Sequence, residues 1–212
     1  MLKRPIDKNV HDGYTRNMIS VVDRLLTQND YSRPGRILRD KRAVILHWVG
    51  VGGQRAQSVQ QFFEAAEREK HYSSAHYCID LDGMVYRFVP DDEVAYHCGS
   101  SQTDPISGRI YTDWARKVFG PCAADPEHNS PNNAALGIEM CVVDNDGNFD
   151  PRTVEAAAEL TAELCKRYAI PAECIGTHHM VVGWKDCPRL WTRSPDLFDE
   201  FKEKVRMISE SK

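Results

Sequence analysis

Apolar positions recur along this chain with two different spacings. Runs of aliphatic and β-branched residues predict strands, whereas apolar residues three and four positions apart predict helices with one buried face. Strands are expected over residues 43–48, 135–143 and 174–177. Helices are expected over residues 17–26, 58–69, 113–119, 151–168 and 196–207. Strands and helices therefore alternate along most of the chain.

A pair of short strand-like runs lies within residues 74–89 and is joined by Asp82 and Gly83. An Asp-Gly pair between alternating apolar residues is a strong signal for a tight hairpin turn. Strands that alternate with helices, with one hairpin among them, predict an α/β fold with a mixed central sheet flanked by helices. At 212 residues, the chain fits a single domain.

The pattern divides the chain into three parts. Residues 1–40 form an N-terminal extension with a helix, residues 41–207 carry the predicted strands, and residues 208–212 are a short tail. Residues 99–134 are rich in Ser, Asp, Pro, Asn and Gly. A connection of that length is more often a lid or groove wall than a simple link, so we expect it to border a functional site.

Charge and hydropathy exclude several classes of partner. The chain has 27 Lys and Arg against 31 Asp and Glu, a formal net charge of -4, which argues against a general affinity for nucleic acid. The sequence has no apolar run of membrane-spanning length, and residues 1–5 lack the apolar stretch of a secretory signal. We therefore expect synthesis in the cytoplasm and no membrane partner.

The seven cysteines have irregular spacing and include no CxxC pair, which is not typical of a disulfide framework. Cys78, Cys141 and Cys165 lie among apolar residues and are expected to be buried thiols. Cys187 differs, because Lys185 and Asp186 precede it and Pro188 follows it. Such surroundings suit a metal ligand better than a core position.

A zinc site is predicted from residues 177–188, which contain two adjacent histidines and Cys187. These are the borderline and soft donors that zinc prefers, and three protein ligands plus water are typical of a catalytic zinc site. His47 ends a predicted strand and is the best third donor. We expect one zinc ion held by His47, His178 and Cys187. Strand alternation directs His178 and His179 to opposite faces, so only one of them can be a ligand.

Glu139 lies inside an apolar predicted strand. An ionised carboxylate is costly there unless it is paired or faces a cleft. Two interpretations remain open from this pattern: an outward charge on an edge strand, or a general base beside a metal site.

Five segments in order give the chain a resemblance to a known family. They are His47 at its strand end, residues 74–83, residues 95–99, residues 132–142 and residues 177–188. Together they resemble the zinc-dependent N-acetylmuramoyl-L-alanine amidases of the type 2 class, which includes phage endolysins, bacterial autolysins, a muropeptide-recycling enzyme and peptidoglycan recognition proteins. The likeness is greatest to the phage and bacillus autolysin branch and runs from about residue 41 to about residue 205.

The resemblance implies roles for individual residues. His47 matches the family's first zinc ligand and Cys187 its last. Glu139 matches the catalytic glutamate of the recycling branch, and Lys185 matches a lysine that stabilises the transition state. Some members carry a catalytic tyrosine where this chain has Ala75, so either Glu139 and Lys185 act without it or activity is reduced.

The middle ligand is ambiguous within the resemblance. The family's usual spacing of eight residues before the last ligand selects His179. Its pattern of a β-branched residue three positions before the ligand and a valine three after fits Ile175 and Val181, and therefore selects His178. That choice requires one inserted residue, which we assign to Trp184, and it is the one we adopt.

Three residues are candidates for substrate binding, namely His97, Trp184 and Asn133. The family position that matches His97 contacts the lactyl or peptide part of the substrate, although a structural role fits the sequence equally. The resemblance implies hydrolysis of the amide between N-acetylmuramic acid and L-alanine in peptidoglycan, acting on the cell wall after release if the protein is a phage lysin or mother-cell autolysin. The alternatives are a module that binds peptidoglycan without cleaving it, and an enzyme that recycles soluble muropeptides.

Overall fold

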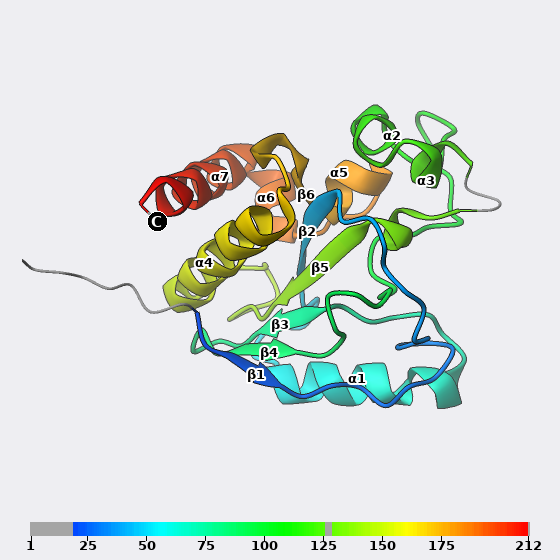
Figure 1. Cartoon of the computed structure of the whole chain (residues 1–212). Coiled ribbons are helices and arrows are strands. Elements are labelled where there is room, and N and C mark those ends of the chain that lie inside the picture. Colours follow the sequence, from blue (N-terminus) through cyan, green and yellow to red (C-terminus); the bar gives the residue numbers. More distant parts are fainter. Residues whose placement is uncertain (1–18, 126–128, 212) are drawn as a thin grey trace, which may run out of the picture.

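A six-stranded mixed sheet forms the centre of the computed structural model, which describes residues 19–125 and 129–211 (Figure 1). The strands are β1 Val21–Asp23, β2 Ala43–Trp48, β3 Tyr77–Ile79, β4 Val85–Arg87, β5 Ala135–Met140 and β6 Ile175–Thr177. Their order across the sheet is β1-β4-β3-β5-β2-β6, and among these pairs only β3 and β4 are antiparallel. The predicted α/β class and the predicted hairpin are therefore confirmed.

Helices cover both faces of the sheet. They are α1 Ala56–Glu69, α2 Asp113–Phe119, α3 Pro121–Ala124, α4 Pro151–Tyr168, α5 His178–Val182, α6 Arg189–Arg193 and α7 Pro195–Glu210, with short 3-10 turns at Pro131–Asn133 and Ala172–Cys174. Figure 1 shows α4 and α7 side by side on one face, with α2 and α5 on the other side of β2. None of the helices within residues 19–125 and 129–211 is long and apolar enough to cross a membrane.

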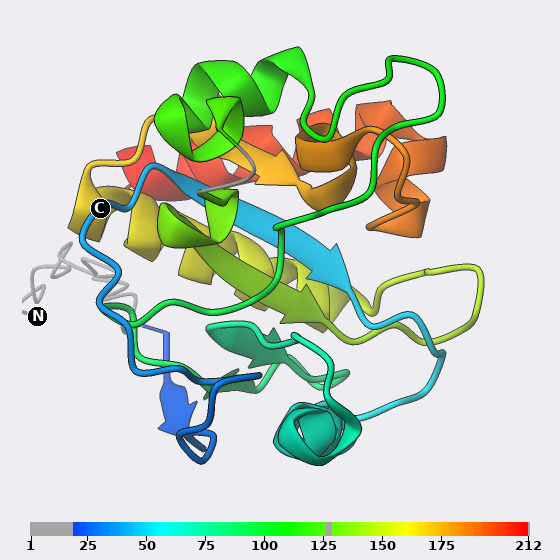
Figure 2. The same ribbon diagram turned by 90° about the vertical axis from the view of Figure 1, so that its right-hand side faces the viewer.

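The alternation of side chains along β2 and β5 separates the core into two layers. Val44 and Leu46 of β2 pack with α4 and α7, whereas Ala43 and Ile45 pack with α2 and α5. Because successive side chains point to opposite faces, His47 follows Ala43 and Ile45 toward the α2 and α5 side. Figure 2 shows β2 and β5 running in the same direction, so their carboxyl ends lie at one edge of the sheet.

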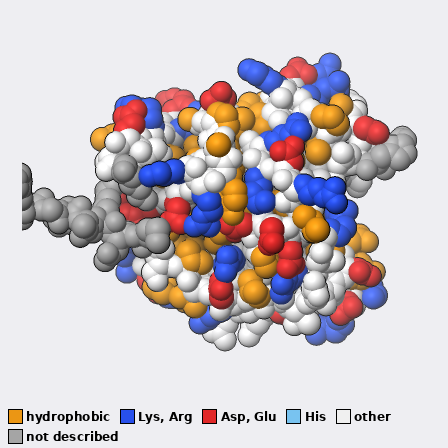
Figure 3. All heavy atoms as spheres, in the orientation of Figure 1, with side chains coloured by type: hydrophobic (Ala, Val, Ile, Leu, Met, Phe, Trp, Pro, Cys, Tyr) orange, Lys and Arg blue, Asp and Glu red, His pale blue; other side chains and the backbone are white. Residues whose placement is uncertain are grey.

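The longest helix, α4, has the boundaries that its sequence predicts. Asp150 accepts a hydrogen bond from the backbone N–H of Arg152, and Pro151 occupies the first turn, where its missing N–H is harmless. Its apolar stripe is buried against the sheet and α7. On the face of the molecule shown in Figure 3, acidic and basic side chains are interspersed.

The expected helix over residues 17–26 is wrong for residues 19–26, which contain strand β1. Val21 and Val22 are β-branched, and β1 pairs in parallel with β4 at the edge of the sheet. Arg24 and Leu26 continue the ladder by donating backbone N–H groups to the carbonyls of Arg87 and Phe88. Pairing with β4 therefore outweighs the local helical spacing. Residues 1–18 of the predicted extension lie outside the described residues.

Candidate metal centre and catalytic cavity

A cavity of about 610 Å³ opens at the carboxyl ends of β2 and β5. This edge is where open α/β sheets commonly hold their ligands. The region over residues 99–134, expected to border a site, supplies part of its wall through Ser100, Tyr111 and Asn132. His47, His178, Cys187, Glu139 and Lys185 line the same cavity. Sequence segments far apart in the chain thus converge here.

Three buried donors form a compact cluster on one side of the cavity. The Nδ1 atoms of His47 and His178 are 3.2 Å apart, and Sγ of Cys187 lies 3.8 Å from Nδ1 of His47. All three ligand atoms lie within 4.8 Å of one another. The spacing brings two imidazoles and one thiol around a common point, as a metal ion requires.

The start of α5 explains why His178, and not His179, joins this cluster. Thr177 caps the helix by accepting a hydrogen bond from the N–H of Met180, so both histidines lie in a first helical turn. The premise that they continue a strand is therefore wrong. His178 is buried in the cavity, while His179 is half-buried and its Nδ1 lies 3.1 Å from the carbonyl of Lys185.

Burial sets the protonation states of the cluster. Desolvation holds the pKa of His47 and of His178 well below the ordinary value, and the positive charge of Lys185 acts in the same direction. Both rings are therefore neutral, which is the form that donates a lone pair to a metal. Burial, with a smaller contribution from Glu139, raises the pKa of the Cys187 thiol to about 12. Because a bound cation favours thiolate, this donor set fits zinc.

Glu139 lies next to the cluster because it is the register partner of His47 on β5. Its Oε2 is buried and has no hydrogen-bond partner among the described residues. Burial raises the pKa of this carboxyl to about 8, and the charge of Lys185 opposes the shift. Of the two interpretations that the sequence left open, the outward surface charge is therefore excluded. A carboxyl that lines a cavity and has a buried, unsatisfied oxygen is typical of a functional group.

Two of the predicted substrate-binding residues lie outside the described lining of this cavity. Trp184 packs against the apolar cluster that includes α2 and α5. The side chain of Asn133 donates to Asn129 at 2.7 Å and accepts from Arg36 at 3.3 Å. Its neighbour Asn132 lines the cavity instead. The sequence motif located this turn but did not show which asparagine faces inward.

His97, the third predicted substrate-binding residue, does line the cavity. Its ring is buried and lies beside His47, with Nδ1 of His97 3.0 Å from Nε2 of His47. Both of its nitrogens have protein partners, because Nε2 lies 3.3 Å from the carbonyl of Ala135. The structure therefore brings His97 to the cluster without a free polar atom for a substrate.

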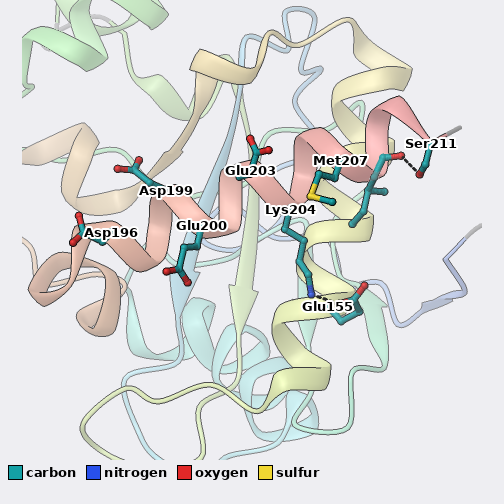
Figure 4. Close-up of a pocket in the computed structure, with 9 residues that line it drawn as sticks. Glu155, Asp196, Asp199, Glu200, Glu203, Lys204, Met207 and Ser211 are labelled. Atoms are coloured by element: carbon teal, nitrogen blue, oxygen red, sulfur yellow. Dashed lines mark hydrogen bonds and ion pairs between the residues drawn. The ribbon is translucent and has the colours of Figure 1, made fainter.

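A larger groove of about 1130 Å³ runs between α4 and α7 (Figure 4). Most of its polar side chains are acidic, and Lys204 forms an ion pair with Glu155 that the close-up draws. Glu203 is likewise paired with Arg206. The described lining contains no imidazole or thiol, so the catalytic chemistry is to be sought in the smaller cavity.

The sequence matches one protein family over most of its length. A family model described as N-acetylmuramoyl-L-alanine amidase matches residues 38–190. A probable N-acetylmuramoyl-L-alanine amidase of Bacillus licheniformis is 32% identical over 189 residues, covering 89% of this chain and 48% of the relative. The amidase BlyA of Bacillus subtilis strain 168 is 30% identical over 179 residues, covering 84% and 44%. The chain thus spans about half the length of the curated relatives it matches.

Solved structures share the fold at lower identity. The PlyG catalytic domain aligns with a TM-score of 0.63 and 17% identity, covering 90% of this chain and 96% of that chain. PlyL aligns with a TM-score of 0.61 and 18% identity, covering 88% and 97%. Such a likeness establishes the overall fold.

Proposed function

The chain belongs to the type 2 N-acetylmuramoyl-L-alanine amidase family, and on this premise we propose that it hydrolyses the amide between N-acetylmuramic acid and L-alanine in peptidoglycan. The observation that carries the proposal is the cavity that holds the His47, His178 and Cys187 cluster together with the unpaired carboxyl of Glu139. A site that only binds a wall fragment has no need of a buried, unpaired acid beside three metal donors.

The three donors are proposed to hold one zinc ion per chain. Two neutral imidazoles and a thiolate leave a net positive charge on such a complex. When bound, the ion would supply Lewis acidity that polarises a carbonyl and lowers the pKa of water toward 7. The support for zinc comes from the donor set and its convergence within 4.8 Å.

Glu139 is proposed as the general base and then the general acid. Its pKa of about 8 reflects burial, and a catalytic carboxyl works best when its pKa is near the working pH. The charge of Lys185 lowers that pKa, and a cation in the cluster would act in the same direction. Glu139 would thus accept a proton from the attacking water and deliver it to the nitrogen of the departing L-alanine.

Lys185 lines the cavity, and the ammonium group of a lysine is a hydrogen-bond donor. We assign it to the oxygen of the scissile carbonyl, where negative charge develops as the carbon becomes tetrahedral. One such donor typically contributes about 3 kcal/mol to transition-state stabilisation. Ala75 is fully buried and packs with the cluster that contains Phe88, so position 75 supplies no hydroxyl, and Glu139 and Lys185 carry the proton transfer and the oxyanion.

The rest of the cavity suits a neutral, hydroxyl-rich substrate. Glu139 and Lys185 are the only Asp, Glu, Lys or Arg in its described lining. Tyr72, Tyr96 and Tyr111 also line the cavity; Tyr72 is exposed, whereas Tyr111 is buried and its hydroxyl bonds the backbone of Ser100. Sugar and peptide groups are bound well by such a mixture of hydroxyls and rings.

The test is digestion of purified sacculi with zinc-loaded protein. We expect new alanine amino groups and no new reducing sugar ends. New reducing ends would identify a glycosidase and contradict the proposal, and binding without cleavage would identify a recognition module. A parallel digestion of soluble muropeptides determines which substrate is preferred, since a recycling enzyme would cleave the fragments faster than the intact wall.

A further inference from the structure

We propose that His97 is a positioning residue that fixes the tautomer and orientation of His47, so that Nδ1 of His47 is presented to the metal. This inference rests on the metal site of the proposed function. It replaces the expectation that His97 contacts the substrate.

The argument begins with the two nitrogens of His47. Nδ1 faces the cluster, at 3.2 Å from Nδ1 of His178 and 3.8 Å from Sγ of Cys187. Nε2 faces away from the cluster, at 3.0 Å from Nδ1 of His97. A neutral imidazole carries one proton, and a metal ligand needs a free lone pair. The proton of His47 must therefore lie on Nε2 and be donated to His97.

The tautomer of His97 follows from its other neighbour. If Nδ1 of His97 accepts from His47, the proton of His97 must be on Nε2. That atom lies 3.3 Å from the carbonyl of Ala135, and a carbonyl oxygen can only accept. One backbone oxygen on β5 thus sets the direction of both hydrogen bonds, from His47 to His97 and from His97 to Ala135.

Two further features hold the His97 ring in place. The side-chain oxygen of Asn132 accepts from the backbone N–H groups of His97, Cys98 and Gly99 at 3.0, 2.8 and 3.0 Å. Residue 137 on β5 is glycine, and a Cβ there would lie 2.6 Å from Cγ of His97. The backbone is therefore clamped on one side, and space for the ring is kept open on the other.

A role in substrate binding fits these observations less well. His97 is 8% exposed, and both of its ring nitrogens are directed at protein atoms. A purely packing role would require only the ring volume, whereas the structure also gives each ring nitrogen a partner within hydrogen-bonding distance. Variants that keep the ring volume but remove the nitrogens can therefore distinguish a positioning role of His97 from a packing role.

The test compares zinc affinity among wild type, His97→Asn, His97→Gln and His97→Phe in the full chain, by competition with a chelator. Asn offers an amide oxygen near the position of Nδ1 and so keeps an acceptor for His47. Gln offers an amide nitrogen near the position of Nε2 and keeps only the bond to Ala135. Phe keeps the volume and neither bond.

We expect His97→Phe and His97→Gln to weaken zinc binding by about 10 to 100-fold, the usual effect of losing a partner of a metal-bound histidine. His97→Asn should remain within about threefold of wild type. Equal affinities for the Asn and Gln variants, or no change in any variant, would overturn the inference. Thermal unfolding of the metal-free proteins identifies any variant that fails to fold. If His97→Phe fails to fold, the comparison of His97→Asn with His97→Gln still tests the inference.

The outcome separates this inference from the proposed function. Wild type that binds zinc tightly but leaves sacculi intact contradicts the amidase proposal and leaves the ranking of affinities meaningful. Wild type that cleaves the wall, with variants of unchanged zinc affinity, contradicts the role of His97 alone. Wild type that binds no zinc contradicts both.

Discussion

His47 and Glu139 are register partners on the adjacent parallel strands β2 and β5, and both side chains line one cavity. The sheet therefore fixes the separation between a candidate ligand and the candidate base. A slip of one residue in this pairing would turn one of them into the apolar layer under α4 and α7. The position of the Glu139 carboxyl beside His47 is therefore set by the backbone pairing of two strands and does not depend on a loop.

Glu139→Gln tests the carboxyl without changing the volume of the side chain. Because an amide cannot accept a proton from water, the rate of wall hydrolysis should fall by about 10² to 10⁴-fold. Zinc content should stay at one per chain, since Glu139 is not a ligand in the proposed site. In the metal-free protein at pH 7 the free energy of unfolding should rise, because burial raises the pKa of this carboxyl to about 8 and so penalises the ionised form, which the neutral amide replaces. Retention of wild-type activity with zinc bound would exclude Glu139 as the base.

The two adjacent histidines of α5 form a matched pair for metal analysis. His178→Ala removes a ring that lies in the cluster, so bound zinc measured by elemental analysis should fall well below one per chain. His179→Ala removes a half-buried ring whose Nδ1 faces the carbonyl of Lys185, and it should retain the metal. The reverse result would assign the ligand to His179 and contradict the cluster described above.

The burial and hydrogen bonds of the His76 ring predict that the protein loses stability in mild acid. Its ring is fully buried, with Nδ1 accepting from the N–H of Gly137 at 3.0 Å and Nε2 donating to the carbonyl of Glu93 at 2.9 Å. These bonds require the neutral ring, and burial lowers its pKa from 6.5 to about 4. Below pH 6.5 the unfolded chain takes up a proton that the folded chain refuses, so stability is complete above this pH and is lost as pH falls toward 4.

The magnitude for His76 is about 3 kcal/mol, because each pKa unit corresponds to about 1.4 kcal/mol. Urea unfolding of metal-free His76→Gln should give a lower free energy than wild type at pH 7 and a smaller decline between pH 6.5 and pH 4.5. His71→Gln, at a half-buried ring in the connection after α1, is the control and should follow wild type. Parallel declines for wild type and His76→Gln would contradict this account.

Much of the fold could be predicted from the sequence because local and tertiary preferences agree in most elements. The stretch Pro151–Tyr168 has a cap, a suitable first residue and a continuous apolar stripe, and it forms α4 within those bounds. The Asp82 and Gly83 turn joins β3 and β4, with Gly83 at a φ of +83°. Residues 19–26 differ, because their valines satisfy a helical spacing locally but pair with a strand about sixty residues away.

Candidate site residues could be chosen from the sequence where the residue type is unusual for its surroundings. The choice was less certain where the direction of a side chain determines whether it lines the cavity. His47, Cys187 and Glu139 are unusual in their apolar or turn surroundings, so the sequence singled them out, and the structure brings all three to one cavity. Asn132 and Asn133 are identical neighbours, and only the 3-10 turn at Pro131–Asn133 directs the first into the cavity. The placement of His97 beside His47 depends on the backbone carbonyl of Ala135, which no residue type signals. It also depends on Gly137, which is visible in the sequence, but the sequence does not show that its missing Cβ makes room for the ring of His97.

Lys185→Met separates charge stabilisation from metal binding. Removing the ammonium should lower the maximal rate of wall hydrolysis by about 100-fold, which corresponds to the roughly 3 kcal/mol of one oxyanion donor. It should also change the pH profile, because Lys185 lowers the pKa of Glu139. The base must be ionised, so activity declines as pH falls through that pKa.

Without the lysine that pKa rises, and the acid limb of the rate profile should move to higher pH. Lys185→Arg keeps the charge and should leave the limb near its wild-type position, even if the rate falls because the donor is misplaced. The measurement is the pH dependence of alanine amino-group release at saturating zinc. If the acid limb of Lys185→Met stays in place while the rate falls, Lys185 acts on the substrate oxygen without influencing Glu139. That result would contradict the proposed effect of the Lys185 charge on the pKa of Glu139.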